Sequence, residues 1–81
     1  MNEDIERRIM EIIAKEAQFD LARLTPASTM DDFEVPSITQ FEAIFAIEDA
    51  FDVELPEDLE DLTLRGLANK VGELMAQKSP S

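Results

Sequence analysis

Apolar residues recur at helical spacing along three stretches of this 81-residue chain, and no stretch alternates convincingly with the period of two typical of strands. The first stripe follows the spacing i, i+4, i+7 and i+8: Ile5, Ile9, Ile12 and Ile13. This spacing predicts an amphipathic helix over about residues 3–17. Similar patterns predict helices over about residues 36–51 and 64–77, the latter capped by Thr63. Leu55-Pro56 begins a further short segment, in which we expect a short helix over about residues 56–60. The sequence therefore predicts an all-α fold, a small four-helix bundle with three main helices and a short third helix.

A long connection, from about Phe19 to Val35, joins the first two predicted helices. Loops of this length are uncommon in compact domains and are usually functional. This one contains apolar side chains of its own: Phe19, Leu21, Leu24, Met30 and Phe33. We therefore expect a packed first loop. Because a chain of this size has room for one core, residues 1–78 are expected to form a single helical domain and residues 79–81 a disordered tail.

The charge of the chain limits its partners. Nineteen acidic and seven basic residues give a formal net charge of −12. Such a field repels nucleic acid and anionic membranes, attracts partners with basic patches, and favours a monomer. No signal peptide and no long apolar run is present, so we expect a cytoplasmic protein without membrane insertion.

Catalysis and metal binding are poorly supported by the residue types present. The chain contains no histidine and no cysteine, which removes the commonest general base, the usual transition-metal ligands and any thiolate nucleophile. The acidic runs at residues 31–34 and 57–61 do not fit the EF-hand calcium loop. We therefore expect neither an enzyme nor a metal site.

The second predicted helix carries more apolar surface than one core-facing stripe requires. Its inner stripe contains Ala43, Ile44, Ile47 and Phe51, and its outer stripe contains Ile38, Phe41 and Phe45. Together the stripes span about 220° of the helix. Two hypotheses follow. The long loop could fold over the outer stripe, or the outer stripe could be an exposed docking patch edged by carboxylates.

Ser37 stands at the start of this helix. A serine in that position is most often a cap for a backbone N–H group. Alternatively, its hydroxyl could carry a phosphate-linked group, because anions are favoured at helix N-termini by about 0.3–1 kcal/mol. A serine hydroxyl is a weak nucleophile and has no base nearby in the sequence, so a separate enzyme would have to activate it.

The stretch from Ala27 to Asp58 resembles the central region of acyl carrier proteins. The matching residues are Ala27-Ser28, Met30-Asp31-Asp32-Phe33, Ser37-Ile38, Glu42, Ala46-Ile47-Glu48-Asp49, Phe51-Asp52 and Glu54-Leu55-Pro56. The resemblance implies a four-helix bundle with a long first loop. It also implies that a phosphopantetheinyl transferase attaches 4′-phosphopantetheine from coenzyme A to Ser37. The thiol of this arm would hold acyl groups as thioesters for enzymes of fatty-acid, specialised lipid or polyketide-type biosynthesis.

The resemblance also implies roles for other positions. The face that binds the transferase and the acyl-processing enzymes, through their basic docking patches, would comprise Ile38, Phe41, Glu42, Phe45, Glu48 and Asp49. An acyl pocket in the bundle would be lined by Ala43, Ile44, Ile47, Phe51, Leu62 and Ala68.

Three positions depart from the family's pattern. Pro36 and Ile38 replace the aspartate and leucine that flank the family's serine, and Glu34 replaces a glycine before them. The proline removes a carboxylate that helps to present the serine, and the glutamate predicts a different final turn of the loop. Two alternatives stay open. One is an aminoacyl or peptidyl carrier, which has the same chemistry with a different cargo, and the other, favoured by Pro36, is an unmodified acidic interaction module that keeps the carrier fold.

Overall fold

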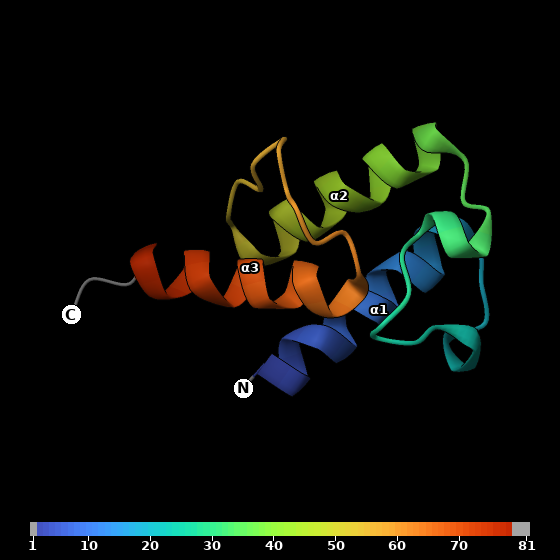
Figure 1. Ribbon diagram of the computed structural model, residues 1–81, viewed down its shortest axis with the longest axis horizontal. Coiled ribbons are helices and arrows are strands. Elements are labelled where there is room, and N and C mark those ends of the chain that lie inside the picture. The colour runs from blue at the N-terminus through green and yellow to red at the C-terminus, as the bar shows by residue number, and fades with distance from the viewer. Residues whose placement is uncertain (1, 79–81) are drawn as a thin grey trace.

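Three α-helices dominate the computed structural model, which describes residues 2–78 (Figure 1). The helices are α1 (Asn2–Ala17), α2 (Ser37–Phe51) and α3 (Leu64–Lys78). Two short 3-10 helices, η1 (Leu21–Arg23) and η2 (Asp31–Phe33), lie in the connection between α1 and α2. Within the described residues there is no strand, only an isolated antiparallel bridge between Thr29 and Thr63. The all-α prediction is confirmed, and the tail predicted at residues 79–81 lies outside the described residues.

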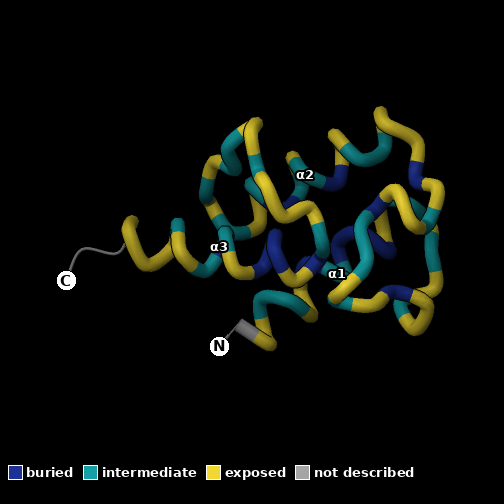
Figure 2. The backbone as a smooth tube through the Cα atoms, viewed as in Figure 1, coloured by how far each residue is buried: buried dark blue, intermediate teal, exposed yellow. Residues whose placement is uncertain are grey.

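The core forms where α1 lies against both α2 and α3. The apolar stripes predicted from the sequence meet there, and the most deeply buried large side chains are Ile9, Ile13, Ile47, Leu64, Leu67 and Val71. Figure 2 shows buried segments of the backbone gathered where the three helices meet. Burial of each such side chain contributes about 1.5–3 kcal/mol to the stability of the bundle.

The prediction of a short helix over residues 56–60 is wrong. The chain instead forms a turn at Glu57 and Asp58 and a bend at Glu60. Acidic residues at positions 57, 58, 60 and 61 would lie three and four residues apart on a helix and repel one another. A single turn has too few hydrogen bonds to offset both this repulsion and the cost of helix nucleation. The described part of the chain is therefore a three-helix bundle.

The long first loop is packed, as the sequence predicts. Leu24, Met30 and Val35 are buried, and the rings of Phe19 and Phe33 meet edge to face with centroids 5.5 Å apart. Backbone bonds also join the loop to the start of α3. The Leu64 N–H group donates to the Ser28 carbonyl at 2.9 Å, and the Arg65 N–H group donates to the Pro26 carbonyl at 2.8 Å.

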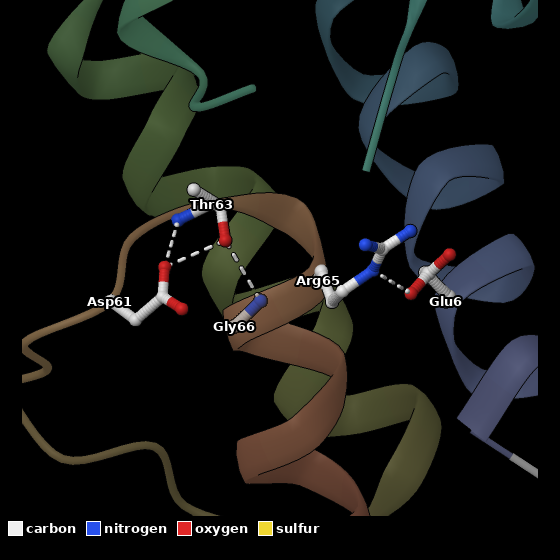
Figure 3. A network of polar contacts seen from close by, with 5 residues as sticks. All are labelled: Glu6, Asp61, Thr63, Arg65 and Gly66. Atoms are coloured by element: carbon white, nitrogen blue, oxygen red, sulfur yellow. Dashed lines mark hydrogen bonds and ion pairs between the residues drawn. The ribbon is translucent and has the colours of Figure 1, made fainter. Parts of the chain in front are cut away.

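The start of α3 is fixed by a small polar network (Figure 3). The Thr63 hydroxyl accepts a hydrogen bond from the Gly66 N–H group at 3.0 Å, which confirms Thr63 as the cap. Asp61 Oδ1 accepts bonds from the Thr63 hydroxyl at 2.6 Å and from the Thr63 N–H group at 3.0 Å. Arg65 pairs with Glu6 at 3.2 Å, which joins the first turn of α3 to α1.

None of the helices within residues 2–78 combines the length and the apolar character needed to span a lipid bilayer.

Candidate functional site

Ser37 is exposed and is the first residue of α2. The N-cap position belongs to Pro36, whose backbone is extended (φ −60°, ψ 148°), and no side chain caps this end of the helix. The hypothesis that Ser37 is itself the cap is therefore wrong. The hydroxyl stands uncovered at the positive end of α2, where the free N–H groups of the first turn favour an anion.

Gln40 fixes the backbone that leads into Ser37. Its Nε2 atom donates to Asp31 Oδ1 at 2.7 Å and to the Val35 carbonyl at 2.8 Å. Its backbone N–H group donates to the Pro36 carbonyl at 2.9 Å. Because Val35 is also buried, the turn that presents Ser37 is held from two sides. Sequence reasoning missed Gln40, whose only signal was a polar residue one turn into an apolar helix.

Glu34 has a left-handed backbone conformation, with φ 58° and ψ 34°. Its N–H group donates to the Asp31 carbonyl at 3.0 Å, which closes η2 just before the chain turns toward Ser37. Glycine adopts this conformation readily, whereas a residue with a Cβ atom does so at a cost of about 1 kcal/mol. The loop therefore makes a turn suited to glycine with a glutamate in its place.

The outer stripe of α2 is exposed. Ile38, Phe41 and Phe45 are 72%, 63% and 62% exposed, respectively, so the hypothesis that the long loop covers them is wrong. Glu42 and Asp49 are exposed on the same helix, whereas Glu48 is only partly exposed. The structure thus has a contiguous apolar and acidic surface along α2 that begins next to Ser37.

An apolar groove of about 580 Å³ lies beside this surface. The α2–α3 segment (residues 52–63) forms its second wall. The lining residues are Phe41, Ile44, Phe45 and Glu48 from α2, and Leu55, Pro56, Glu57, Leu59 and Leu62 from the segment. The groove starts one turn beyond Ser37, about 6 Å along the helix axis.

Only part of the acyl pocket expected from the sequence lines this groove. Ile44 and Leu62 do so, and Leu62 is 55% exposed. Ala43, Ile47 and Ala68 are completely buried in the core, and Phe51 packs against that core. Sequence reasoning missed Leu55 and Leu59, because the sequence predicts a short helix over residues 56–60 rather than an irregular segment that forms the wall of an apolar groove.

No group of three or more acidic residues within residues 2–78 is arranged to hold a metal ion. The runs at residues 31–34 and 57–61 instead supply caps and turns, as Asp32 does by accepting a bond from the Thr29 N–H group at 2.8 Å.

Comparisons with known proteins agree with this geometry. A family model described as a phosphopantetheine attachment site matches residues 7–71. The acyl carrier protein of Streptococcus pneumoniae serotype 4 is 35% identical over 66 residues, which cover 82% of this chain and 89% of that protein. The acyl carrier protein of Streptococcus pyogenes serotype M3 is 36% identical over 69 residues, covering 85% and 84%, respectively. No solved structure gives a significant match.

The chain therefore belongs to the family of carrier proteins with a phosphopantetheine attachment site. Its prosthetic group is 4′-phosphopantetheine, which is held covalently. An exposed hydroxyl at a helix N-terminus fits such a group, because the phosphodiester is anionic and its arm extends into solvent.

Proposed function

We propose that this protein is an acyl carrier protein whose 4′-phosphopantetheine arm is attached to Ser37. The arm holds acyl groups as thioesters for partner enzymes of fatty-acid, specialised lipid or polyketide-type biosynthesis. The protein acts as a cytoplasmic monomer and catalyses no step itself. The observation that supports the attachment residue is the exposed Ser37 hydroxyl at the uncapped start of α2.

The attachment reaction needs little from this chain beyond presentation of Ser37. The Oγ atom of Ser37 attacks the phosphorus atom that bears the pantetheine in coenzyme A. A new P–O bond forms, the bond to the 3′,5′-ADP portion breaks, and the proton of the hydroxyl passes to a base of the transferase. Gln40 contributes by holding Asp31 and Val35, and hence the turn in which Ser37 lies.

The partner-binding surface is the outer stripe of α2 with its carboxylates. Ile38, Phe41 and Phe45 supply apolar contact, and Glu42 and Asp49 supply charge. The transferase and the acyl-processing enzymes meet this surface with apolar patches edged by Arg and Lys side chains. The net charge of −12 steers such partners to the protein, so raising the ionic strength weakens docking.

The groove beside the outer stripe holds the apolar part of the acyl cargo. Its nearest lining residue on α2, Phe41, lies four positions from Ser37, so an arm attached there reaches it without rearrangement of the bundle. Ile44 and Leu62 from the expected acyl pocket keep their proposed role, and Leu55 and Leu59 join them.

Intact mass analysis tests the attachment. The protein is incubated with coenzyme A, magnesium and several phosphopantetheinyl transferases, beside Ser37→Ala and Ser28→Ala variants. The wild type and Ser28→Ala are expected to gain the mass of one phosphopantetheine, and Ser37→Ala none. No gain by the wild type with any transferase would instead support an unmodified interaction module.

A further inference from the structure

Glu48 binds the chain that leaves α2 through three backbone N–H groups. Its carboxylate Oε2 atom accepts a hydrogen bond from the Leu55 N–H group at 2.7 Å. Its carbonyl accepts bonds from the N–H groups of Asp52 and Val53, the latter at 3.1 Å, while Asp52 has a left-handed backbone. The Glu48 side chain also lines the groove. One residue of α2 thus fixes the beginning of the α2–α3 segment.

The far end of the same segment is fixed separately. Asp61 and Thr63 form the polar network at the start of α3 (Figure 3). Between these two anchors the segment contains no helix, and Leu55, Leu59 and Leu62 line the groove. The yellow-to-orange part of the ribbon in Figure 1 shows this segment beside the C-terminal half of α2. The segment lacks regular structure, so its distance from α2 depends on these anchors and on the packing of Val53, Leu55 and Leu59 against the core.

We propose that Glu48 is a positioning residue for the groove, and that its bond to the Leu55 N–H group sets the width available to an apolar ligand. This inference rests on the proposed function in one respect, which is that the ligand is the acyl cargo. It gives Glu48 a different role from Glu42 and Asp49, because the Glu48 carboxylate is engaged within the chain and is partly buried. Removing the acceptor atom leaves the Leu55 N–H group without this bond to α2, which frees the start of the segment to move away from the helix.

The test uses the full chain without the arm, in three variants. Glu48→Ala removes the acceptor. Glu48→Gln keeps an acceptor oxygen and removes the charge. Glu54→Ala is the matched control, because Glu54 is an exposed carboxylate next to Leu55 that does not line the groove.

The first readout is amide hydrogen exchange measured by NMR. Glu48→Ala is expected to speed exchange of the Leu55 amide about tenfold, while the core amides of Ile13 and Val71 change less than about twofold. Glu48→Gln is expected to restore protection to within about threefold of the wild type. Equal acceleration of the Leu55 and core amides would mean general destabilisation and would overturn the proposal.

The second readout is binding of Nile red, a neutral apolar dye whose fluorescence reports its surroundings. Glu48→Ala is expected to weaken dye binding several-fold, Glu48→Gln to restore it, and Glu54→Ala to leave it unchanged. Unchanged dye binding by Glu48→Ala, or equal defects in Glu48→Ala and Glu48→Gln, would overturn the proposal. Neither readout involves Ser37, so failure of the mass test would refute the carrier function without affecting this result.

Discussion

A side chain on Gly66 would collide with Asp61, because a Cβ atom there would lie 2.4 Å from the Asp61 Cγ atom and 2.6 Å from the Asp61 carbonyl oxygen. The missing side chain thus allows Asp61 to lie against the first turn of α3 and hold Thr63 in its capping position. This accounts for a glycine inside a helix, where it costs about 1 kcal/mol relative to alanine.

Gly66→Ala is expected to lower the free energy of unfolding by about 1–3 kcal/mol despite the better helix propensity of alanine, because Asp61 must move. Urea unfolding followed by circular dichroism measures the change. Gly72→Ala, also within α3, is the control and should raise stability by about 0.5–1 kcal/mol. A Gly66→Ala protein as stable as this control would show that the Asp61 contact is unimportant.

The Asp61 carboxyl group contributes to the acid sensitivity of the protein. Hydrogen bonds from the Thr63 hydroxyl and then from the Thr63 N–H group hold the pKa of Asp61 below its ordinary value, and a small effect of burial opposes them. A carboxyl whose pKa is lower in the folded state stabilises that state above the unfolded pKa of about 4. This stabilisation is lost as the pH falls from there through the folded pKa.

Asp61→Asn keeps an acceptor oxygen and removes the titration. The melting temperature of Asp61→Asn is therefore expected to fall less than that of the wild type as the pH drops below about 4. Near pH 7 the melting temperatures of the two proteins should depend on pH to nearly the same extent. Thermal unfolding at a series of pH values checks this. If the melting temperatures of the two proteins fall equally at acid pH, the Asp61 carboxyl group does not contribute to the acid sensitivity.

Pro36→Asp should improve both the start of α2 and the modification of Ser37. No side chain caps this helix, and aspartate at the N-cap position stabilises a helix by about 1 kcal/mol relative to alanine. Because Pro36→Ala also loses the rigid ring, the informative comparison is between the two variants. Pro36→Asp should unfold at a higher urea concentration than Pro36→Ala and should accept phosphopantetheine faster. Equal rates would indicate that the transferase does not require the carboxylate.

Glu34→Gly should stabilise the protein by about 0.5–1 kcal/mol, because it relieves a left-handed conformation at φ 58°. The gain is partly offset by the greater freedom of glycine in the unfolded chain. Glu34→Ala removes the same charge and keeps the Cβ atom, so it separates conformation from electrostatics. A similar gain from the alanine variant would attribute the effect to charge.

Phe41→Ala and Phe45→Ala should separate docking from stability. Each side chain is more than half exposed, so its removal should change the free energy of unfolding by less than about 0.5 kcal/mol and weaken binding to the transferase. Ile47→Ala, in the completely buried stripe of the same helix, should instead cost about 2–5 kcal/mol. Undiminished transferase binding by both phenylalanine variants would place docking on another surface.

Neutralising Glu42 and Asp49 should slow association with the transferase and reduce its dependence on ionic strength. Stopped-flow binding of Glu42→Gln and Asp49→Asn at low and high salt measures both effects. Glu73→Gln, an exposed carboxylate on α3, controls for the loss of one charge. The same salt dependence in all three variants would argue against recognition through α2.

Local patterns were sufficient to predict the three main helices. The isoleucine stripe located α1, and Thr63 before an apolar run located the start of α3, because both signals lie within one or two helical turns. The prediction of a short helix over residues 56–60 was wrong because it took no account of the repulsion among the acidic residues of that stretch.

The candidate site was only partly predictable for a related reason. Ser37 could be singled out from its position and its neighbours, but the exposure of Phe41 depends on where the long loop packs. The position of the loop is fixed in part by backbone hydrogen bonds from Leu64 and Arg65, which are far away from the loop in the sequence. The bond from Leu55 to Glu48 spans seven residues across an irregular segment, so no periodicity predicts it.

The backbone bonds between the first loop and α3 have a consequence for the order of events during protein synthesis. Pro26 and Ser28 accept hydrogen bonds from residues that leave the ribosome almost forty positions later. Until those residues emerge, the polypeptide upstream of Ser37 lacks part of its support. We expect the nascent chain to be a poor transferase substrate until Leu64 and Arg65 have emerged.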